Sequence, residues 1–147
     1  MKITVLCAGK IKEKFYQDAI AEYNKRLSRY CKSAVIEVAD GPDMYAEAER
    51  FLARLPEDAY IITLEIGGKK LNSVELSEKI EKLGIEGKSH ICFIIGGSDG
   101  LAEAVLKKSD FALSFSDMTF PHQLMRVILF EQIYRSFKII ANEPYHK

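Results

Sequence analysis

The chain has 147 residues, which is enough for one domain with a hydrophobic core of its own. Hydrophobic residues make up 48% and charged residues 29% of the sequence, and this balance excludes an intrinsically disordered chain. No apolar run approaches the ~20 residues that span a bilayer, and the opening apolar segment is too short for a signal peptide. We therefore expect a cytoplasmic protein with no membrane partner and a single domain over residues 1–147.

The three cysteines and the charge pattern further limit the classes of protein to which the chain can belong. Cys7, Cys31 and Cys92 are odd in number and lack CxxC spacing, so we expect reduced thiols and neither a disulfide framework nor a zinc site. The formal net charge is zero, but residues 1–35 carry an excess of five positive charges and residues 36–66 an excess of six negative ones. The basic segment permits an RNA partner, and a solvated lysine-rich helix explains it as well.

Strand and helix patterns alternate along the whole chain. Helices are expected at residues 12–30, 44–55, 73–83, 101–108 and 121–141, and strands at residues 3–8, 33–39, 59–66, 90–95 and 111–115. Gly67-Gly68 is interpreted as a turn and Ser73 as a helix cap. Because several strands are apolar on both faces, the pattern predicts an α/β protein with a mainly parallel sheet and helices on both faces.

Three polar or glycine-rich segments follow predicted strands. They are Leu64-Glu-Ile-Gly-Gly-Lys69, the loop at residues 96–100 and the elbow at residues 115–120. In a parallel sheet these segments open on the same edge, where ligands gather. The loop at residues 96–100 does not match a phosphate loop, and taken alone it would be interpreted as a structural turn. Glycine backbone together with Leu64, Met118 and Phe120 suits a flat, uncharged group such as adenine.

Candidate catalytic groups are few near this edge. Asp99 and Asp117 do not suffice for a metal site, and we expect none. His122 stands at a helix start, where it can relay a proton or form a plain hydrogen bond. Ser114, Ser116 and Thr119 lack the GxSxG elbow of a hydrolase, so hydrogen bonds to a ligand or to loop backbone are the simpler interpretation.

The last helix is apolar nearly all round its axis. A helix of this kind must be covered on two sides, so we infer a homodimer formed through it. Arg126 and Arg135 are nine residues apart on this helix, so the two side chains need not serve the same surface.

Several of these motifs together resemble one family. Leu64–Lys69, Ile95-Gly-Gly-Ser-Asp-Gly-Leu101, the segment Leu113–Arg126 with its Thr119-Phe-Pro-His122 elbow, Glu131-Gln-Ile-Tyr-Arg135 and the ending Pro144-Tyr-His-Lys147 are similar to the bacterial 23S ribosomal RNA (pseudouridine-N3)-methyltransferases. Those enzymes belong to the SPOUT class of knotted methyltransferases. The opening residues 1–30 share the likeness, so the resemblance covers essentially the whole chain.

The resemblance implies a fold, a cofactor and a partner. The C-terminal segment would form a deep trefoil knot, an exception to the rule that chains avoid knots. S-adenosylmethionine, without a metal, would be the cofactor, and a homodimer would act on large-subunit ribosomal RNA. By motif match, the cofactor-binding residues would be Leu64, Gly96, Phe115, Ser116, Asp117, Met118, Thr119 and Phe120.

The implied reaction is methyl transfer to N3 of a pseudouridine. The candidate residues around the base are His122, Tyr145, His146, Arg126 and Arg135, with the arginines on phosphate or imide oxygen. Because the chain carries no appended RNA-binding module, we expect assembled ribosomes to be the substrate. Two other functions remain open: a different nucleotide-binding α/β enzyme, and a non-catalytic ribosome-associated dimer with a SPOUT fold.

Overall fold

A parallel five-stranded sheet forms the centre of the protein. The computed structural model describes residues 1–147. The strands are β1 (Lys2–Ala8), β2 (Lys32–Val38), β3 (Tyr60–Lys70), β4 (His90–Ile95) and β5 (Phe111–Ser114), and the helices are α1 (Lys14–Leu27), α2 (Met44–Arg54), α3 (Ser73–Ile85), α4 (Glu103–Leu106) and α5 (His122–Ile140). In space the strands follow the order β2-β1-β4-β3-β5, and every neighbouring pair is parallel. The expected α/β class is confirmed.

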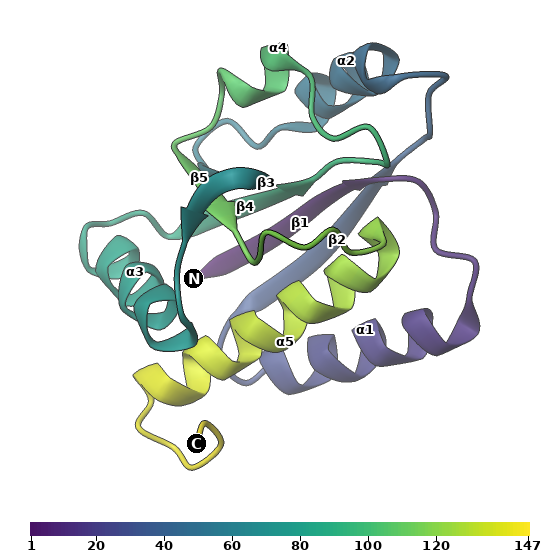
Figure 1. Cartoon of the computed structure of the whole chain (residues 1–147). Coiled ribbons are helices and arrows are strands. Elements are labelled where there is room, and N and C mark those ends of the chain that lie inside the picture. Colours follow the sequence, from purple (N-terminus) through teal and green to yellow (C-terminus); the bar gives the residue numbers. More distant parts are fainter.

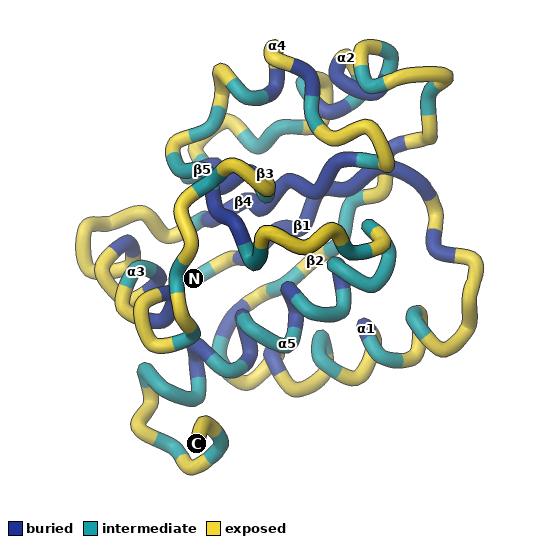
Figure 2. Tube along the Cα trace, in the orientation of Figure 1, coloured by how far each residue is buried: buried dark blue, intermediate teal, exposed yellow.

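Helices cover both faces of this sheet (Figure 1). α5 packs between α1 and α3 on one face, and α2 and α4 lie on the other. The side chains of β4 alternate between the two cores, with Ile91 and Phe93 in the first and Cys92 and Ile94 in the second. Because both faces are covered, the strand is apolar at nearly every position. Figure 2 shows the buried residues concentrated in the strands at the centre.

The glycine pair after Ile66 is not a turn, contrary to the sequence-based expectation. β3 continues through Gly67 and Gly68 to Lys70, and its pairing with β5 shifts so that Leu64 and Lys69 both lie opposite Leu113. A Cβ atom on Gly68 would lie 2.8 Å from the backbone carbon and oxygen of Ala112. A glycine is therefore needed where the irregular strand passes close to the β5 backbone.

Two helix boundaries also differ from the expectation. The cap of α3 is Asn72 and not Ser73: the Glu75 backbone N–H donates to the Asn72 side chain at 2.8 Å, and the Asn72 N–H donates to the Glu75 carboxylate at 2.8 Å. This reciprocal pair is a capping box, which satisfies two free donors at once. The helix expected at residues 101–108 is only Glu103–Leu106, since Ala102 is extended and residues 107 and 108 form a turn.

Other helices of the same chain cover more of α5 than its apolar composition suggested. Arg126, Leu129, Phe130, Ile133, Tyr134, Ser136 and Phe137 are buried, and none of the other α5 residues is fully exposed. α1 and α3 provide this cover from either side. A half-exposed apolar strip remains at Leu124, Val127 and Ile128. None of the helices combines the length and apolarity that a membrane crossing requires.

Candidate functional site

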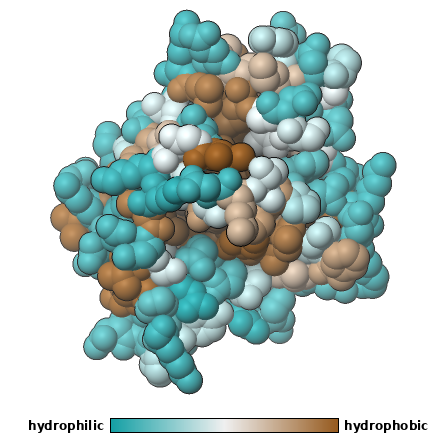
Figure 3. Space-filling model, viewed as in Figure 1, coloured by the Kyte–Doolittle hydropathy of each residue, from teal (hydrophilic) through white to brown (hydrophobic).

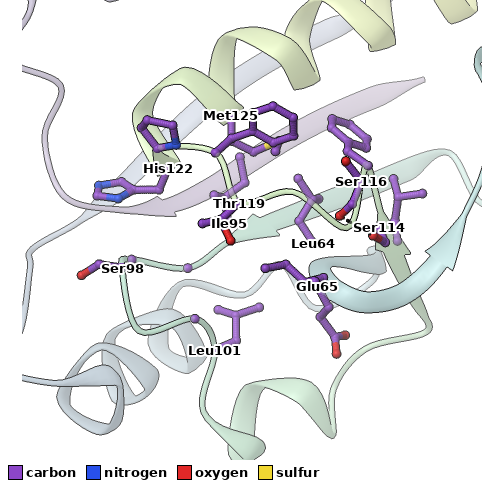
Figure 4. A pocket seen from close by; sticks show the side chains of 18 of the residues that line it. Leu64, Glu65, Ile95, Ser98, Leu101, Ser114, Ser116, Thr119, His122 and Met125 are labelled. Carbon is purple, nitrogen blue, oxygen red and sulfur yellow. Dashed lines mark hydrogen bonds between the residues drawn. The ribbon is translucent and has the colours of Figure 1, made fainter.

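A cavity of about 810 Å³ opens at the edge of the sheet where the strands end. Its walls come from β3 at residues 64–66, from the loop after β4 at residues 95–101, and from residues 113–122 with Met125 of α5. Figure 4 shows His122 and Met125 on the α5 side of the cavity and Ser98 and Leu101 on the opposite side. The three segments that the sequence placed at one edge thus surround one space.

Seven of the eight expected cofactor-binding residues line this cavity. They are Leu64, Gly96, Phe115, Ser116, Met118, Thr119 and Phe120. Asp117 is the exception, because its carboxylate pairs with the Lys70 ammonium outside the cavity. That pair joins the end of β3 to the elbow before α5. Both side chains are largely exposed, so the pair contributes little stability.

The glycine loop after β4 is folded tightly against itself. The Gly100 backbone N–H donates to the Gly97 carbonyl at 3.0 Å, and Gly100 has a φ of 82°. A Cβ atom on Gly96 would lie 2.5 Å from the Gly100 carbonyl oxygen, closer than any side chain can approach. The loop therefore presents bare backbone to the cavity, which lets a ligand approach closely.

Serine hydroxyls hold the elbow between β5 and α5 in shape. Ser114, which is buried, donates to the Ser116 carbonyl at 3.2 Å, and the Met118 N–H donates to the Ser116 hydroxyl at 3.0 Å. These bonds to loop backbone match one of the two interpretations drawn from the sequence. They leave neither serine poised beside a general base.

Two large apolar side chains stand exposed at the rim of the cavity. Ile66 is 54% exposed and Met118 72% exposed, and both line the cavity. In the space-filling view, apolar surface gathers in the middle of this face and hydrophilic surface surrounds it (Figure 3). Motif matching did not single out Ile66, Ser98, Leu101 or Met125, which also line the cavity. The apolar ending of β3 was the available signal for Ile66, and the helical spacing after Pro121 was the signal for Met125.

The five candidate catalytic residues do not come together within one chain. His122 is the first residue of α5 and lines the cavity. Arg135, Tyr145 and His146 lie at the opposite end of α5, since thirteen residues of helix span about 20 Å. One chain therefore holds two separate groups of candidates.

The distant group is organised by one carboxylate. Arg135 Nε donates to Glu131 at 2.8 Å, Arg135 Nη1 lies 3.0 Å from Nδ1 of His146, and the Tyr145 hydroxyl donates to Glu131 at 3.4 Å. The guanidinium also stacks over the Tyr145 ring, 4.8 Å from its centre. Burial and then the Glu131 carboxylate raise the pKa of Tyr145 above its ordinary value. At neutral pH Tyr145 is therefore a hydrogen-bond donor and not a base.

Arg126 belongs to neither group. Its side chain is fully buried, and it is absent from the cavity wall. Nη2 donates to the carbonyl oxygens of Ala8 and Gly9 at 2.6 and 2.7 Å, and Nη1 donates to Glu37 at 2.8 Å. These partners engage three of the four N–H groups at its forked end, and the side chain is fully buried, so the geometry favours a structural role for this residue.

No group of three or more His, Cys, Asp or Glu side chains in the structure is arranged to hold a metal ion. The three cysteines are buried and free, and burial raises the pKa of the Cys7 and Cys92 thiols to about 12. The cavity walls offer glycine backbone, apolar side chains and a few hydroxyls, which suit an organic ligand with a flat ring.

Comparison with known proteins covers the whole chain. A family model described as "Predicted SPOUT methyltransferase" matches residues 1–146. The chain is 55% identical to the ribosomal RNA large subunit methyltransferase H of Bifidobacterium adolescentis and 52% identical to that of Acetivibrio thermocellus, with full coverage of both chains in each case.

A solved structure supports the fold independently. The tRNA (m1G37) methyltransferase of Aquifex aeolicus superposes with a TM-score of 0.58 over 100% of this chain and 74% of that protein, at 17% identity. The sequence matches and the shared architecture agree with the glycine-lined cavity at the strand ends. The chain therefore belongs to the SPOUT methyltransferase family.

Proposed function

We propose that this protein is an S-adenosylmethionine-dependent methyltransferase of large-subunit (23S) ribosomal RNA, acting at N3 of a pseudouridine. The observation that carries the proposal is the cavity at the sheet edge, with glycine backbone on one side and the elbow of residues 115–120 on the other. Full-length relatives named ribosomal RNA large subunit methyltransferase H support the choice of substrate. We further propose that it acts in the cytoplasm and that its C-terminal segment forms a trefoil knot, as the family resemblance implies.

The cavity fits the cofactor by size and by chemistry. Its volume of about 810 Å³ lies within the range of small-molecule sites. Gly96 and Gly100 leave room for backbone to approach the adenosine, and Leu64 and Phe120 supply apolar walls for the adenine ring. When bound, S-adenosylmethionine supplies an electrophilic methyl group on a sulfonium centre.

His122 is the chain's own candidate for moving a proton. It stands at the start of α5, on the wall of the cavity that would hold the cofactor. In its neutral form the imidazole accepts the N3 proton of the base, so that the nitrogen can attack the methyl carbon in line. Tyr145, held as a phenol, would exchange its hydrogen bond to Glu131 for one to a carbonyl oxygen of the base.

A homodimer would reunite the two groups of candidates. α5 is about 28 Å long, and a second α5 packed antiparallel against it about a two-fold axis brings the tail of the partner subunit to this chain's His122. The half-exposed strip at Leu124, Val127 and Ile128 offers the apolar surface for such a contact. A second cavity of about 330 Å³ beside Ile128 and Gln132 lies on the same side of the helix.

Mixing two inactive variants tests this arrangement directly. His122→Ala and Tyr145→Ala proteins are each expected to be inactive as homodimers. After co-refolding, half of the molecules are heterodimers in which one of the two sites has both native residues, so about a quarter of the parent activity returns. No recovery, with heterodimers confirmed by native mass spectrometry, would show that both residues act within one chain.

Three experiments test the activity itself. In single-turnover methylation with saturating cofactor, unchanged rates for both His122→Ala and His146→Ala would eliminate the proton-acceptor role. Mass spectrometry of ribosomal RNA from a deletion strain, with and without the restored gene, reports the base and the methyl position. We expect intact ribosomes to be methylated and naked RNA to be a poor acceptor; equal rates on both would refute the ribosome assignment.

A further inference from the structure

One surface loop beside the cavity is fixed by several hydrogen bonds to the sheet. It is the connection between β1 and α1, residues 9–13, called here the lysine loop after Lys10 and Lys12. The Gly9 N–H donates to the Val38 carbonyl at 2.8 Å, and the Ile11 N–H donates to the Glu37 carboxylate at 3.0 Å. Ile11 is buried, 5% exposed, between its two exposed lysine neighbours.

The strongest tie to this loop comes from Arg126. Its guanidinium donates to the Ala8 and Gly9 carbonyls and to Glu37, so one buried cation joins α5 to the end of β1 and to β2. Burying an arginine costs free energy that only well-placed partners offset. Its Nε has no partner at all, so part of that cost is not recovered. A loop that only connects a strand to a helix would not need a contact with this free-energy cost.

The tie places the lysine loop at the cavity. Arg126 lies one helical turn after His122, about 6 Å along the α5 axis. His122 lines the cavity, and Figure 4 shows it beside the purple N-terminal backbone that follows β1. The loop thus flanks the His122 side of the cavity.

The two lysines of the loop are free to bind an anion. Both are exposed, and neither takes part in any ion pair of the structure. Of the acidic groups around the loop, Glu37 pairs with Arg126, whereas Glu13 and Asp40 are exposed and take part in no ion pair. Lys14, the next basic residue, is paired with Asp18 on the surface of α1.

We propose that the lysine loop binds phosphates of the substrate RNA next to the target base, and that Arg126 is a positioning residue that fixes this loop against α5. The inference rests on the proposed function, because it supplies the RNA. Lys10 and Lys12 neutralise phosphates as point charges, so they act on affinity for RNA and not on the methyl group. A fixed loop keeps the two charges in place and avoids ordering them on binding.

The experiment compares a Lys10→Ala/Lys12→Ala protein with a Lys107→Ala/Lys108→Ala control in ribosome methylation. The control lysines are also exposed, but they follow α4, on the opposite face of the sheet. For the loop variant we expect kcat/KM for ribosomes to fall roughly tenfold near physiological salt, and the slope of log kcat/KM against log salt to become shallower by about 1 to 2. The control should match the parent in both quantities.

A second variant tests the positioning role. Glu37→Gln keeps the shape of the Arg126 partner and removes its charge, which loosens the loop without emptying the core. We expect its KM for ribosomes to rise severalfold, with the dissociation constant of S-adenosylmethionine unchanged; a merely structural Arg126 contact would leave the KM unchanged in a folded protein. A loop variant whose KM and salt slope equal those of the control would overturn the proposal.

Two different results would refute the lysine-loop proposal and the proposed function. If the parent protein methylates ribosomes and the loop variant does so with the same salt dependence, only the lysine-loop proposal is lost. If the parent binds S-adenosylmethionine but methylates no ribosomal RNA, the proposed function itself is refuted.

Discussion

Replacing Gly96 with alanine should weaken cofactor binding, because the new methyl group has no room. Its carbon would lie 2.5 Å from the Gly100 carbonyl oxygen and 2.7 Å from the Gly100 carbonyl carbon. Ordinary contact starts near 3.4 Å, so the backbone turn must move by about 0.9 Å. Both clashing atoms are backbone, which cannot swing aside as a flexible side chain does.

The size of the effect follows from the cost of such an overlap. Overpacking of this kind costs about 1–3 kcal/mol. If the closed loop is the form that binds the cofactor, the dissociation constant of S-adenosylmethionine rises about 5- to 150-fold. Gly67→Ala is the matched control: an added Cβ there meets nothing within 4 Å, so affinity should stay within about twofold of the parent.

Isothermal titration calorimetry at 25 °C measures both dissociation constants, and thermal unfolding verifies that each variant is folded. A folded Gly96→Ala protein that binds S-adenosylmethionine as tightly as the parent would refute the proposal that the closed glycine loop forms part of the cofactor site. A loss of thermal stability without any loss of affinity would show that the loop is a structural turn, which is the alternative left open by the sequence.

Three further changes probe the fold. Asn72→Ala should lower the free energy of unfolding by about 1 kcal/mol in urea titrations, because it breaks the capping box of α3; a loss below about 0.5 kcal/mol would contradict the cap assignment. Phe51→Ala, at a side chain 1% exposed, should cost about 3–5 kcal/mol, and a loss below about 1 kcal/mol would contradict its packing. Burial and then Lys2 lower the pKa of His90, so the unfolded state binds more protons and Tm should decrease as pH falls below about 6.5. His90→Gln should flatten that part of the profile of Tm against pH, while the exposed His146→Gln should not; identical profiles for both variants would refute the argument.

The hydrophobic pattern determined the order and type of the elements. β4 was predicted with its observed bounds, since a continuous apolar run between polar residues has few other interpretations. Boundaries set by local polar chemistry were less predictable. Asn72 and Ser73 are both good caps, and only the backbone geometry shows which side chain accepts the bond from Glu75.

Long-range contacts determined the features that the hydrophobic pattern could not predict. Gly67-Gly68 resembles a turn in sequence, but the close approach of the β5 backbone makes it part of an irregular strand. From its place in a helix near the elbow, Arg126 was expected to contact RNA. Its partners are carbonyls of residues 8 and 9, more than 110 positions away, and no local pattern reveals that pairing.

Sequence alone determined the α/β class, the family and the three segments that form the cavity, because strand ends in a parallel sheet must meet at one edge. Only the tertiary structure decided how the candidate residues divide. It placed His122 at the cavity, buried Arg126 as a tie to the lysine loop, and set Arg135 and Tyr145 at the far end of α5. The physical reason is the rigid helix: residues near in sequence on α5 are held about 20 Å apart in space.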